Sequence, residues 1–199
     1  KLLYVFDFLA REVAIRTAAT RFPDTVNVFI NFMPNSVLDP QRSLEKTVND
    51  CVNTGIRPER VVFEIVESES IADIASLKML LDTYRARGFK VALDDLGSGY
   101  SGLNYMLELM PDFVKLDREL VNKCAQSNFK RIVVAKLTEA AHFMGIKVVA
   151  EGIEQVDDYN VVRDLGVDIV QGYLFAKPSA DTVYGLNHNL LPGSNGATH

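Results

Sequence analysis

The sequence contains little cysteine, only Cys51 and Cys124, and no tryptophan. It has no Cys-x-x-Cys pair and no Cys/His cluster, which argues against a disulfide framework or a structural zinc site and favours a reducing, cytoplasmic location. No apolar run approaches the roughly 20 residues that cross a bilayer, and no signal peptide opens the chain. Lys and Arg number 21 against 26 Asp and Glu, a net charge of −5. This balance provides no basic surface for long nucleic acid, although a small phosphate ligand held through metal stays open.

The remaining composition is that of an ordinary globular domain. With 199 residues, of which 48% are hydrophobic and 24% charged, the chain can bury one sizeable core. It begins inside a helical pattern without a start methionine, so we expect a piece of a longer protein. We assign residues 1–191 to one partial domain and expect the Gly/Ser/Asn-rich residues 192–199 to be disordered.

Short apolar strands alternate with amphipathic helices. Strands are expected at 26–31, 61–66, 90–94, 113–117, 147–151 and 168–173. Helices are expected at 2–16, 41–54, 70–87, 100–109, 129–144, 155–165 and 179–186, three of them followed by a terminating glycine (Gly88, Gly145 and Gly166). This alternation predicts parallel βαβ units. Six units fit an open doubly wound sheet or an α/β (βα)8 TIM-like barrel with its first strands missing, and the abrupt start favours the barrel, which typically needs about 250 residues.

Acidic residues stand where runs of β-branched and apolar residues stop. They are Glu64, Asp94, Asp95, Asp117 and Glu151, and Asn31 ends the first strand in the equivalent place. Parallel strands bring their carboxyl ends to one edge of a sheet, so these side chains should converge. Two carboxylates about 4 Å apart repel by roughly 4 kcal/mol at an effective dielectric near 20, so such a cluster calls for a cation. Oxygen ligands favour Mg²⁺, Mn²⁺ or Ca²⁺.

Lys115 is predicted to point to the same side as Asp117, because side chains alternate along a strand. An inward lysine beside inward acids fits either a phosphate and metal site or a buried ion pair between these two residues. Each acid, taken alone, is also explained as a cap or turn residue for the next helix. The joint occurrence of five acids with an inward lysine favours the metal site.

Other signals have plain structural explanations. Phe6, Leu9 and Val13 form a helical stripe, for which packing in the core is the default interpretation. The two cysteines are interpreted in the same way. His142 lies on a predicted helix away from any strand end, which indicates a packing or surface residue rather than a metal ligand.

A glycine-rich loop follows the strand at 90–94. Residues 97–102 match G-x-G-x-x-G literally, and Asp117 follows about 20 residues after Gly97, as in dinucleotide-binding loops. However, Asp94 and Asp95 would repel a pyrophosphate at this place. We therefore favour a sharply turned loop over a metal site, with an NAD-binding domain as the weaker alternative.

Taken together, these motifs resemble the EAL domain, the bacterial phosphodiesterase module for cyclic di-GMP. The resemblance rests on Ile-Asn-Phe at 30–32, Glu-Ile-Val-Glu at 64–67, Asp-Asp-Leu-Gly-Ser-Gly at 94–99, Lys-Leu-Asp at 115–117, Ala-Glu-Gly-Ile-Glu at 150–154 and Gln-Gly-Tyr-Leu-Phe-Ala-Lys-Pro at 171–178. It departs from the family at 32–34, where Phe-Met-Pro replaces the usual Leu-Ser. The Glu-Ala-Leu tripeptide itself is absent, which we attribute to an upstream segment that these residues do not include.

The resemblance implies a (βα)8-like barrel that holds two metal ions, Mg²⁺ or Mn²⁺, at its carboxyl face. The ligands or supports of these ions would be Asn31, Glu64, Asp94, Asp95, Asp117 and Glu151. Lys115 and Glu151 would position and deprotonate the attacking water. The predicted reaction is hydrolysis of cyclic di-GMP to linear pGpG, with Ca²⁺ as an inhibitory ion because it is larger and less strict in its geometry.

The resemblance also implies supporting residues and partners. The glycine loop (Gly97 and Gly99) would be held by Glu67, and Glu154 and Gln171 would help bind the site or its ligand. We expect a homodimer, as is typical of the family, and an upstream sensory or GGDEF-type domain in the full-length protein, which could carry a membrane anchor. The alternative function is a catalytically inactive EAL-type receptor that binds cyclic di-GMP without cleaving it.

Overall fold

The computed structural model describes residues 2–37, 39–66, 73–99 and 102–179. Six strands form one parallel sheet in which hydrogen-bonded neighbours follow each other in chain order. They are β1 (Val28–Asn31), β2 (Val61–Val66), β3 (Lys90–Leu96), β4 (Phe113–Leu116), β5 (Lys147–Ala150) and β6 (Ile169–Val170). A doubly wound sheet would reverse its strand order part-way. The unbroken order instead gives a half-barrel, which confirms the predicted TIM-like class.

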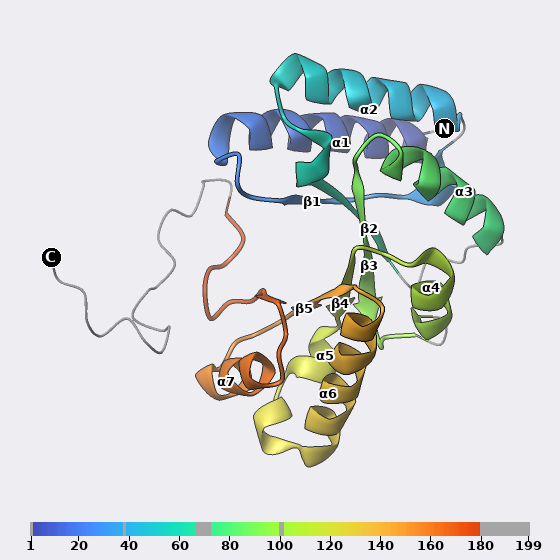
Figure 1. The fold of residues 1–199 in the computed structure, drawn as a ribbon. Helices are drawn as coiled ribbons and strands as arrows, with labels where there is room; N and C mark the ends of the chain where they lie inside the picture. Colours follow the sequence, from blue (N-terminus) through green and yellow to red (C-terminus); the bar gives the residue numbers. More distant parts are fainter. Residues whose placement is uncertain (1, 38, 67–72, 100–101, 180–199) are drawn as a thin grey trace, which may run out of the picture.

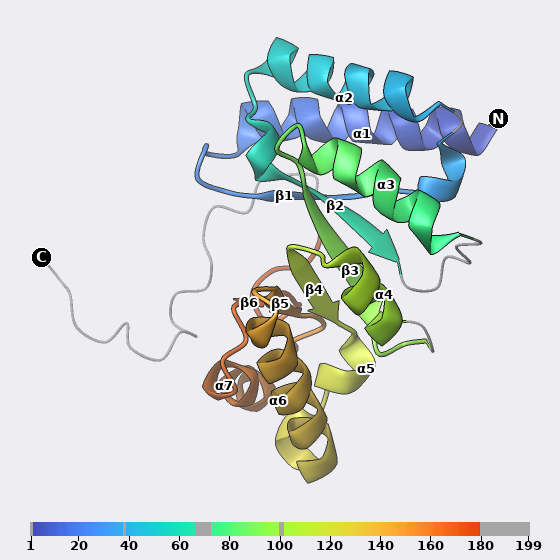
Figure 2. The same ribbon diagram turned by 45° about the vertical axis from the view of Figure 1, so that its right-hand side comes forward.

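Helices cover the outer, convex side of the half-barrel (Figures 1 and 2). They are α1 (Leu2–Arg21), α2 (Pro40–Thr54), α3 (Ile74–Arg85), α4 (Gly102–Leu109), α5 (Arg118–Val121), α6 (Asn128–Phe143) and α7 (Val156–Asp164), with short 3-10 turns η1 (Pro34–Ser36), η2 (Pro58–Arg60) and η3 (Cys124–Gln126). After α6 and α7 the chain turns at Gly145 (φ 76°) and Gly166 (φ 86°). Both were predicted as helix terminators, because glycine adopts a left-handed backbone without steric cost.

The two faces of the sheet have different neighbours. Alternate strand residues such as Phe63, Val91 and Val148 pack outward into the two large clusters beneath the helices. The intervening residues, Phe29, Val62, Ala92, Phe113 and Val149, form a separate apolar layer on the concave side. The rings of Phe29 in β1 and Phe113 in β4 meet edge to face at 5.2 Å, which requires strong curvature of the sheet. The polar residues near the carboxyl ends of the strands lie on the same concave face, next to this apolar layer.

Two aspartates fix the amino ends of the strands. Asp112 precedes β4 and accepts a hydrogen bond from the Val91 N–H of β3 at 2.9 Å. In the same way, Asp168 precedes β6 and accepts from the Val148 N–H of β5 at 2.8 Å. The Asp168 carboxylate also contacts Nε2 of His142 at 2.8 Å, so His142 is a surface residue with a structural partner. The repeated contact sets the relative height of neighbouring strands and hence of their opposite ends.

The interpretation of the α1 stripe is wrong. Phe6, Leu9 and Val13 are 53–65% exposed, whereas the buried face of the helix carries Asp7 and Arg11 together with Ile15 and Ala18. Arg11 and Asp7 form a buried ion pair with 3.1 Å between Nη2 and Oδ2. This pair allows two charged residues to lie on the buried face of α1. The spacing of apolar residues alone therefore indicated the wrong face.

Most predicted boundaries are confirmed within a few residues. β6 is much shorter than the predicted strand at 168–173, α1 extends beyond the predicted end at residue 16, and the short α5 was not predicted. Both cysteines are free and buried, as expected. The predicted helix at 179–186 and the tail at 192–199 lie outside the described residues, apart from Ser179. Within the described ranges, no helix combines the length and apolar character that crossing a bilayer requires.

Candidate active site

The strand ends gather the acids on the concave side of the sheet. Asn31, the last residue of β1, pairs in register with Glu64 of β2, which in turn pairs with Ala92 of β3. Asp94 lies two residues beyond Ala92 and therefore on the same face. Glu151 follows directly after β5. These residues come from four different strands, which is why only the folded sheet brings them together.

Lys115 lies at the centre of this group. From β4 its Nζ reaches Glu64 Oε1 at 2.5 Å, Asp94 Oδ1 at 2.9 Å and Glu151 Oε1 at 2.7 Å. The lysine side chain is only 6% exposed. The sequence left open a simple pair with Asp117, but the ion pairs that Lys115 makes among the described residues are with three other acids. One ammonium group of β4 therefore connects its own strand with β2, β3 and the end of β5 at the site.

Burial dominates the electrostatics of this group. It raises the pKa of Glu64 and of Glu151, and the nearby Lys115 ammonium offsets this only in part. Burial by itself would lower the pKa of Lys115, but the surrounding carboxylates outweigh it and raise that pKa above its ordinary value. Lys115 thus stays protonated at neutral pH, but its single charge does not fully stabilise the ionised forms of the two glutamates. An additional cation beside them would stabilise their ionised forms.

A β-bulge brings Asp94 and Asp95 to the same place. Simple alternation would send two consecutive strand residues to opposite faces. Between β3 and β4, however, the register shifts so that Leu93 pairs with Val114 and Leu96 with Leu116, which leaves one extra residue in β3. The backbone of Asp95 accommodates the bulge by adopting a φ of 57°, in the left-handed region. The Asp94 carboxylate then accepts a hydrogen bond from the Asp95 N–H at 3.0 Å.

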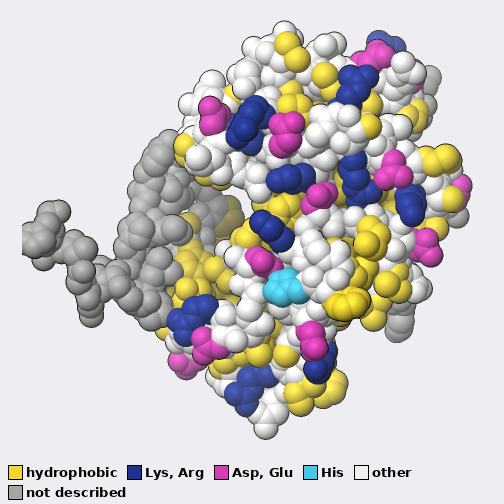
Figure 3. Space-filling view, viewed as in Figure 1, with side chains coloured by type: hydrophobic (Ala, Val, Ile, Leu, Met, Phe, Trp, Pro, Cys, Tyr) yellow, Lys and Arg dark blue, Asp and Glu magenta, His cyan; other side chains and the backbone are white. Residues whose placement is uncertain are grey.

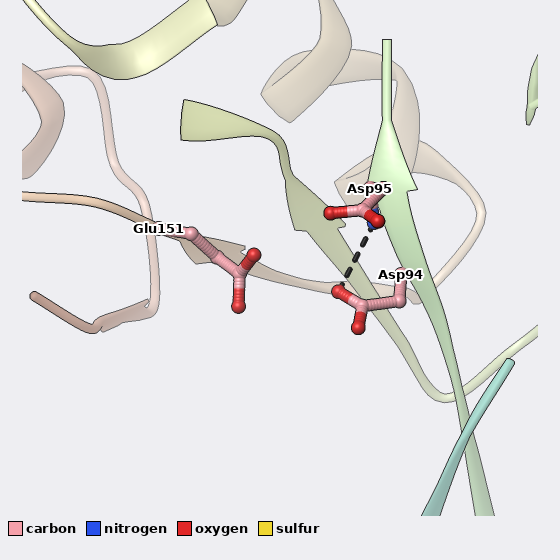
Figure 4. Close-up of side chains that lie close together, drawn as sticks. All are labelled: Asp94, Asp95 and Glu151. Atoms are coloured by element: carbon pink, nitrogen blue, oxygen red, sulfur yellow. Dashed lines mark hydrogen bonds between the residues drawn. The ribbon is translucent and has the colours of Figure 1, made fainter. Parts of the chain in front are cut away.

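Three carboxylates approach one another closely enough to share an ion. One oxygen each from Asp94, Asp95 and Glu151 lies within 4.8 Å of the others, and Figure 4 shows the three side chains directed toward a common space. A divalent ion bound at roughly 2.0–2.6 Å from each oxygen needs ligand oxygens separated by about 3–5 Å. The oxygen-only donor set suits Mg²⁺, Mn²⁺ or Ca²⁺. The residues present therefore fit a hard divalent metal.

A cleft of about 350 Å³ opens beside the acids. Its walls include Asp95, Asp117, Arg118, Glu151, Glu154 and Gln171. Asp117 Oδ1 accepts a hydrogen bond from the Glu119 N–H at 2.7 Å and so caps α5. Arg118 pairs with Glu154 at 2.7 Å and was missed by the sequence argument, although its place directly after a strand-end acid could have indicated it. The cleft is thus mainly acidic, with one guanidinium on its wall.

The glycine loop lies against α5. Gly97 has a φ of 104°, which other residues rarely adopt, and a Cβ atom there would stand 2.5 Å from Leu120 Cδ1, so the Leu120 side chain would have to move. Gly99 belongs to the same exposed turn. Glu67, predicted to hold the loop, lies outside the described residues.

The family model for the EAL domain matches residues 2–178. The chain belongs to the EAL domain family. An uncharacterised protein from Azorhizobium caulinodans is 33% identical over 83% of the chain. A probable cyclic di-GMP phosphodiesterase from Escherichia coli, PdeG, is 29% identical over 85% of the chain. BluF, a blue light- and temperature-regulated antirepressor from the same species, is 23% identical over 88%.

Solved structures of EAL proteins share the fold. A standalone EAL protein from Vibrio cholerae in its c-di-GMP-bound form matches with a TM-score of 0.87 and 30% identity, over 94% of this chain and 78% of that one. Klebsiella pneumoniae BlrP1, in a manganese/cy-diGMP complex, matches with a TM-score of 0.83 and 31% identity, over 88% of this chain and 45% of that one. A calcium/cy-diGMP complex of BlrP1 matches with a TM-score of 0.81.

The EAL match covers only part of the relatives. The chain spans 23% of the length of the A. caulinodans protein, 34% of PdeG and 43% of BluF. The EAL family model includes the glycine loop at 97–102. This loop was the only basis for the NAD-binding alternative, which we therefore no longer pursue.

Proposed function

We propose that this EAL domain hydrolyses cyclic di-GMP to linear pGpG with the help of divalent metal ions. The observation that carries the proposal is the cluster in which Lys115 contacts Glu64, Asp94 and Glu151 while Asp95 faces two of these acids across a few ångströms. The names of two relatives, a probable and a plain cyclic di-GMP phosphodiesterase, and an EAL structure in its c-di-GMP-bound form support the same reaction class.

Asp94, Asp95 and Glu151 are the proposed core of the metal site, because their oxygens already lie within 4.8 Å of one another. The proposed outer members are Asn31 at the end of β1, Glu64 within β2 and Asp117 directly after β4. Bound divalent ions would neutralise charge on the phosphodiester and lower the pKa of a water molecule to near neutrality. Mg²⁺ and Mn²⁺ are the proposed native ions, and a pair of them fits the number of carboxylates.

Glu151 is the proposed base for the attacking water. Burial raises its pKa, and a carboxylate with a raised pKa accepts a proton more readily. The Lys115 ammonium, 2.7 Å from Glu151 Oε1, holds this carboxylate in a fixed orientation. It also leaves a positive charge close to where the phosphate oxygens would lie. Gln171 and the Arg118–Glu154 pair, on the wall of the adjoining cleft, are the proposed contacts to the rest of the ligand.

A receptor that binds cyclic di-GMP without turnover is the second candidate, since relatives such as BluF act as antirepressors. A binding module has no need for a buried lysine among several acids, whose assembly is costly without metal. The retained acids therefore favour the enzyme.

Turnover separates the two candidates. The assay uses the longest native chain that contains these residues, with cyclic di-GMP and Mg²⁺, and follows pGpG by chromatography. We expect pGpG from the wild type, none from Glu151→Gln, and wild-type rates from Glu139→Gln, an exposed glutamate on α6. Tight binding without product from the wild type would establish the receptor.

Ca²⁺ is expected to support binding of cyclic di-GMP but to slow its hydrolysis, because it accepts larger and more variable coordination shells than Mg²⁺. Initial rates with each ion at saturating concentration test this, and equal rates would contradict it.

We further propose a homodimer formed through α4 and α6, near the glycine loop. Leu103 and Leu107 of α4 and Phe129 and Ile132 of α6 are 54–76% exposed, and apolar side chains gather over this part of the surface in Figure 3. Exposed apolar patches of this kind commonly mark contacts between proteins. Light scattering should give a dimer mass for the wild type and a monomer mass for Phe129→Glu.

We also propose that a sensory or GGDEF-type domain lies upstream in the full-length protein, and that this EAL domain is cytoplasmic.

A further inference from the structure

The first helix carries a buried ion pair that the proposed reaction does not use. Asp7 and Arg11 of α1 both have side chains no more than 3% exposed, with 3.1 Å between Arg11 Nη2 and Asp7 Oδ2. Buried ion pairs contribute little net stability compared with apolar residues of similar size, since desolvating two charges is costly. A specific structural task is the better-attested reason for such a pair. The contacts around it indicate what that task is.

The pair holds the segment that directly follows Asn31. Asp7 Oδ1 accepts a hydrogen bond from the Met33 N–H at 3.2 Å. The Arg11 guanidinium lies over the Phe32 ring, 5.1 Å from its centroid. On its other side, the Phe32 N–H donates to the Glu64 carbonyl of β2 at 2.9 Å. Residues 32 and 33 are therefore fixed between α1 and β2, and the backbone of Asn31 is fixed with them.

Arg11 is itself anchored to two further helices. Its Nη2 donates to Ser43 Oγ of α2 at 3.1 Å, and its Nη1 donates to Tyr84 Oη of α3 at 3.4 Å. Tyr84 Oη in turn donates to Ser43 Oγ at 3.0 Å. Three helices thus share one polar network, and this network contacts Phe32 and Met33 directly after β1. The hydrogen bonds of a buried network of this kind strengthen one another.

We propose that Asp7 and Arg11 are positioning residues that set the direction of the Asn31 side chain toward the acidic cluster. This inference rests on the proposed function, in which Asn31 is a metal ligand. The pair acts through the backbone of residues 32–33 and does not touch the ligand. It also gives a reason for Phe32, the first residue of the unusual Phe-Met-Pro segment, because Arg11 stacks on its ring.

The test compares Asp7→Ala with Asp7→Asn, which keeps an acceptor for the Met33 N–H. Mn²⁺ affinity is measured by calorimetry. Supporting groups of metal ligands typically change affinity by about 10–100-fold, so we expect at least a tenfold loss for Asp7→Ala and a change below twofold for Asp7→Asn. Added to Asn31→Ala, the Asp7→Ala substitution should change the affinity by less than twofold, because the residue through which it acts is already gone.

Arg60→Gln is the matched control for lost stability. Arg60 is also buried and pairs with Asp24 at 2.7 Å, but at the amino end of β2, away from Asn31. It should lower the melting temperature without changing the Mn²⁺ affinity of the folded protein. An equal loss of affinity from Asp7→Ala with and without Asn31, or no loss from folded Asp7→Ala, would overturn the proposal. Should Asp7→Ala not fold, Asp7→Ser, too short to reach Met33, takes its place.

A metal-free readout separates this inference from the proposed function. The side-chain amide of Asn31 is followed by NMR without metal. One sharp pair of resonances is expected in the wild type and in Asp7→Asn, and broadened or multiple resonances in Asp7→Ala. If the wild type fails to bind Mn²⁺ while Asp7→Ala disturbs Asn31, the proposed function fails and the positioning role stands. If the wild type binds Mn²⁺ and Asp7→Ala leaves both Asn31 and the affinity unchanged, only the positioning role fails.

Discussion

Replacing Lys115 by methionine should destabilise the metal-free protein severely. The substitution keeps the length of the side chain but removes a charge that lies 2.5–2.9 Å from three carboxylate oxygens. Removing one partner of a buried ion pair costs about 3–5 kcal/mol, because the remaining charges are left uncompensated. We expect a loss of this size in the free energy of unfolding at pH 7.5, measured by urea denaturation in the presence of a chelator.

The deficit of Lys115→Met should depend on pH and on metal. Burial raises the pKa of Glu64 and Glu151 already in the wild type, so the folded state takes up protons more readily than the unfolded chain. Their contribution to stability is therefore present below the ordinary carboxyl pKa and is lost as the pH rises through the folded pKa. Without the ammonium both values rise further. The deficit should shrink as the pH falls toward 5, and millimolar Mn²⁺ should reduce it at pH 7.5.

Lys136→Met is the control for this prediction. Lys136 pairs with Glu139 at 2.6 Å, but both side chains are about 70% exposed, and exposed ion pairs contribute roughly 0–1 kcal/mol. A deficit for Lys115→Met that is no larger than for Lys136→Met, or one that does not change with pH or Mn²⁺, would refute the electrostatic account of the site.

Three further predictions concern the fold. Gly172→Ala should cost about 3 kcal/mol or more in urea denaturation, because a Cβ atom would stand 2.1 Å from the Ile153 carbonyl oxygen; a loss below 1 kcal/mol would contradict the close approach. Asp168→Ala should cost about 1–2 kcal/mol at pH 7. Burial opposes ionisation of Asp168, but its hydrogen bonds hold its pKa below the usual range. The difference in stability between wild type and Asp168→Ala should therefore be present at neutral pH and vanish as the pH falls through that pKa. Val13→Lys, on the exposed face of α1, should shift the melting temperature little, whereas Ile15→Lys should prevent folding; the reverse order would restore the original interpretation of α1.

Much of the fold was predictable because its signals are local. The strand at 61–66 and the helices ending at Gly145 and Gly166 are marked by β-branched runs and by glycines that the structure uses as terminators. The buried face of α1 was not predictable from the sequence. Asp7 and Arg11 can be buried there only because they pair with each other and form hydrogen bonds with Met33 and Tyr84. Those contacts are long-range in sequence, and no periodicity encodes them.

The candidate site was predictable as a set of residues at one edge, but not as a geometry. The points where the apolar runs stop give Glu64, Asp94 and Glu151, yet only the register between strands makes all three partners of Lys115. The bulge that turns Asp95 toward Asp94 has no signature in the residues before it. Long-range register and local bulges decide which acids meet, and both are properties of the assembled sheet.

We propose that the acids at the carboxyl edge of the sheet hold divalent ions. The most direct test is a crystal structure of the protein with Mn²⁺ and cyclic di-GMP, with the ions located by anomalous scattering. We expect Mn²⁺ peaks in contact with carboxylate oxygens of Asp94, Asp95 and Glu151. Full occupancy of ligand with no anomalous peak at these residues, and with Lys115 still bridging Glu64, Asp94 and Glu151, would contradict it.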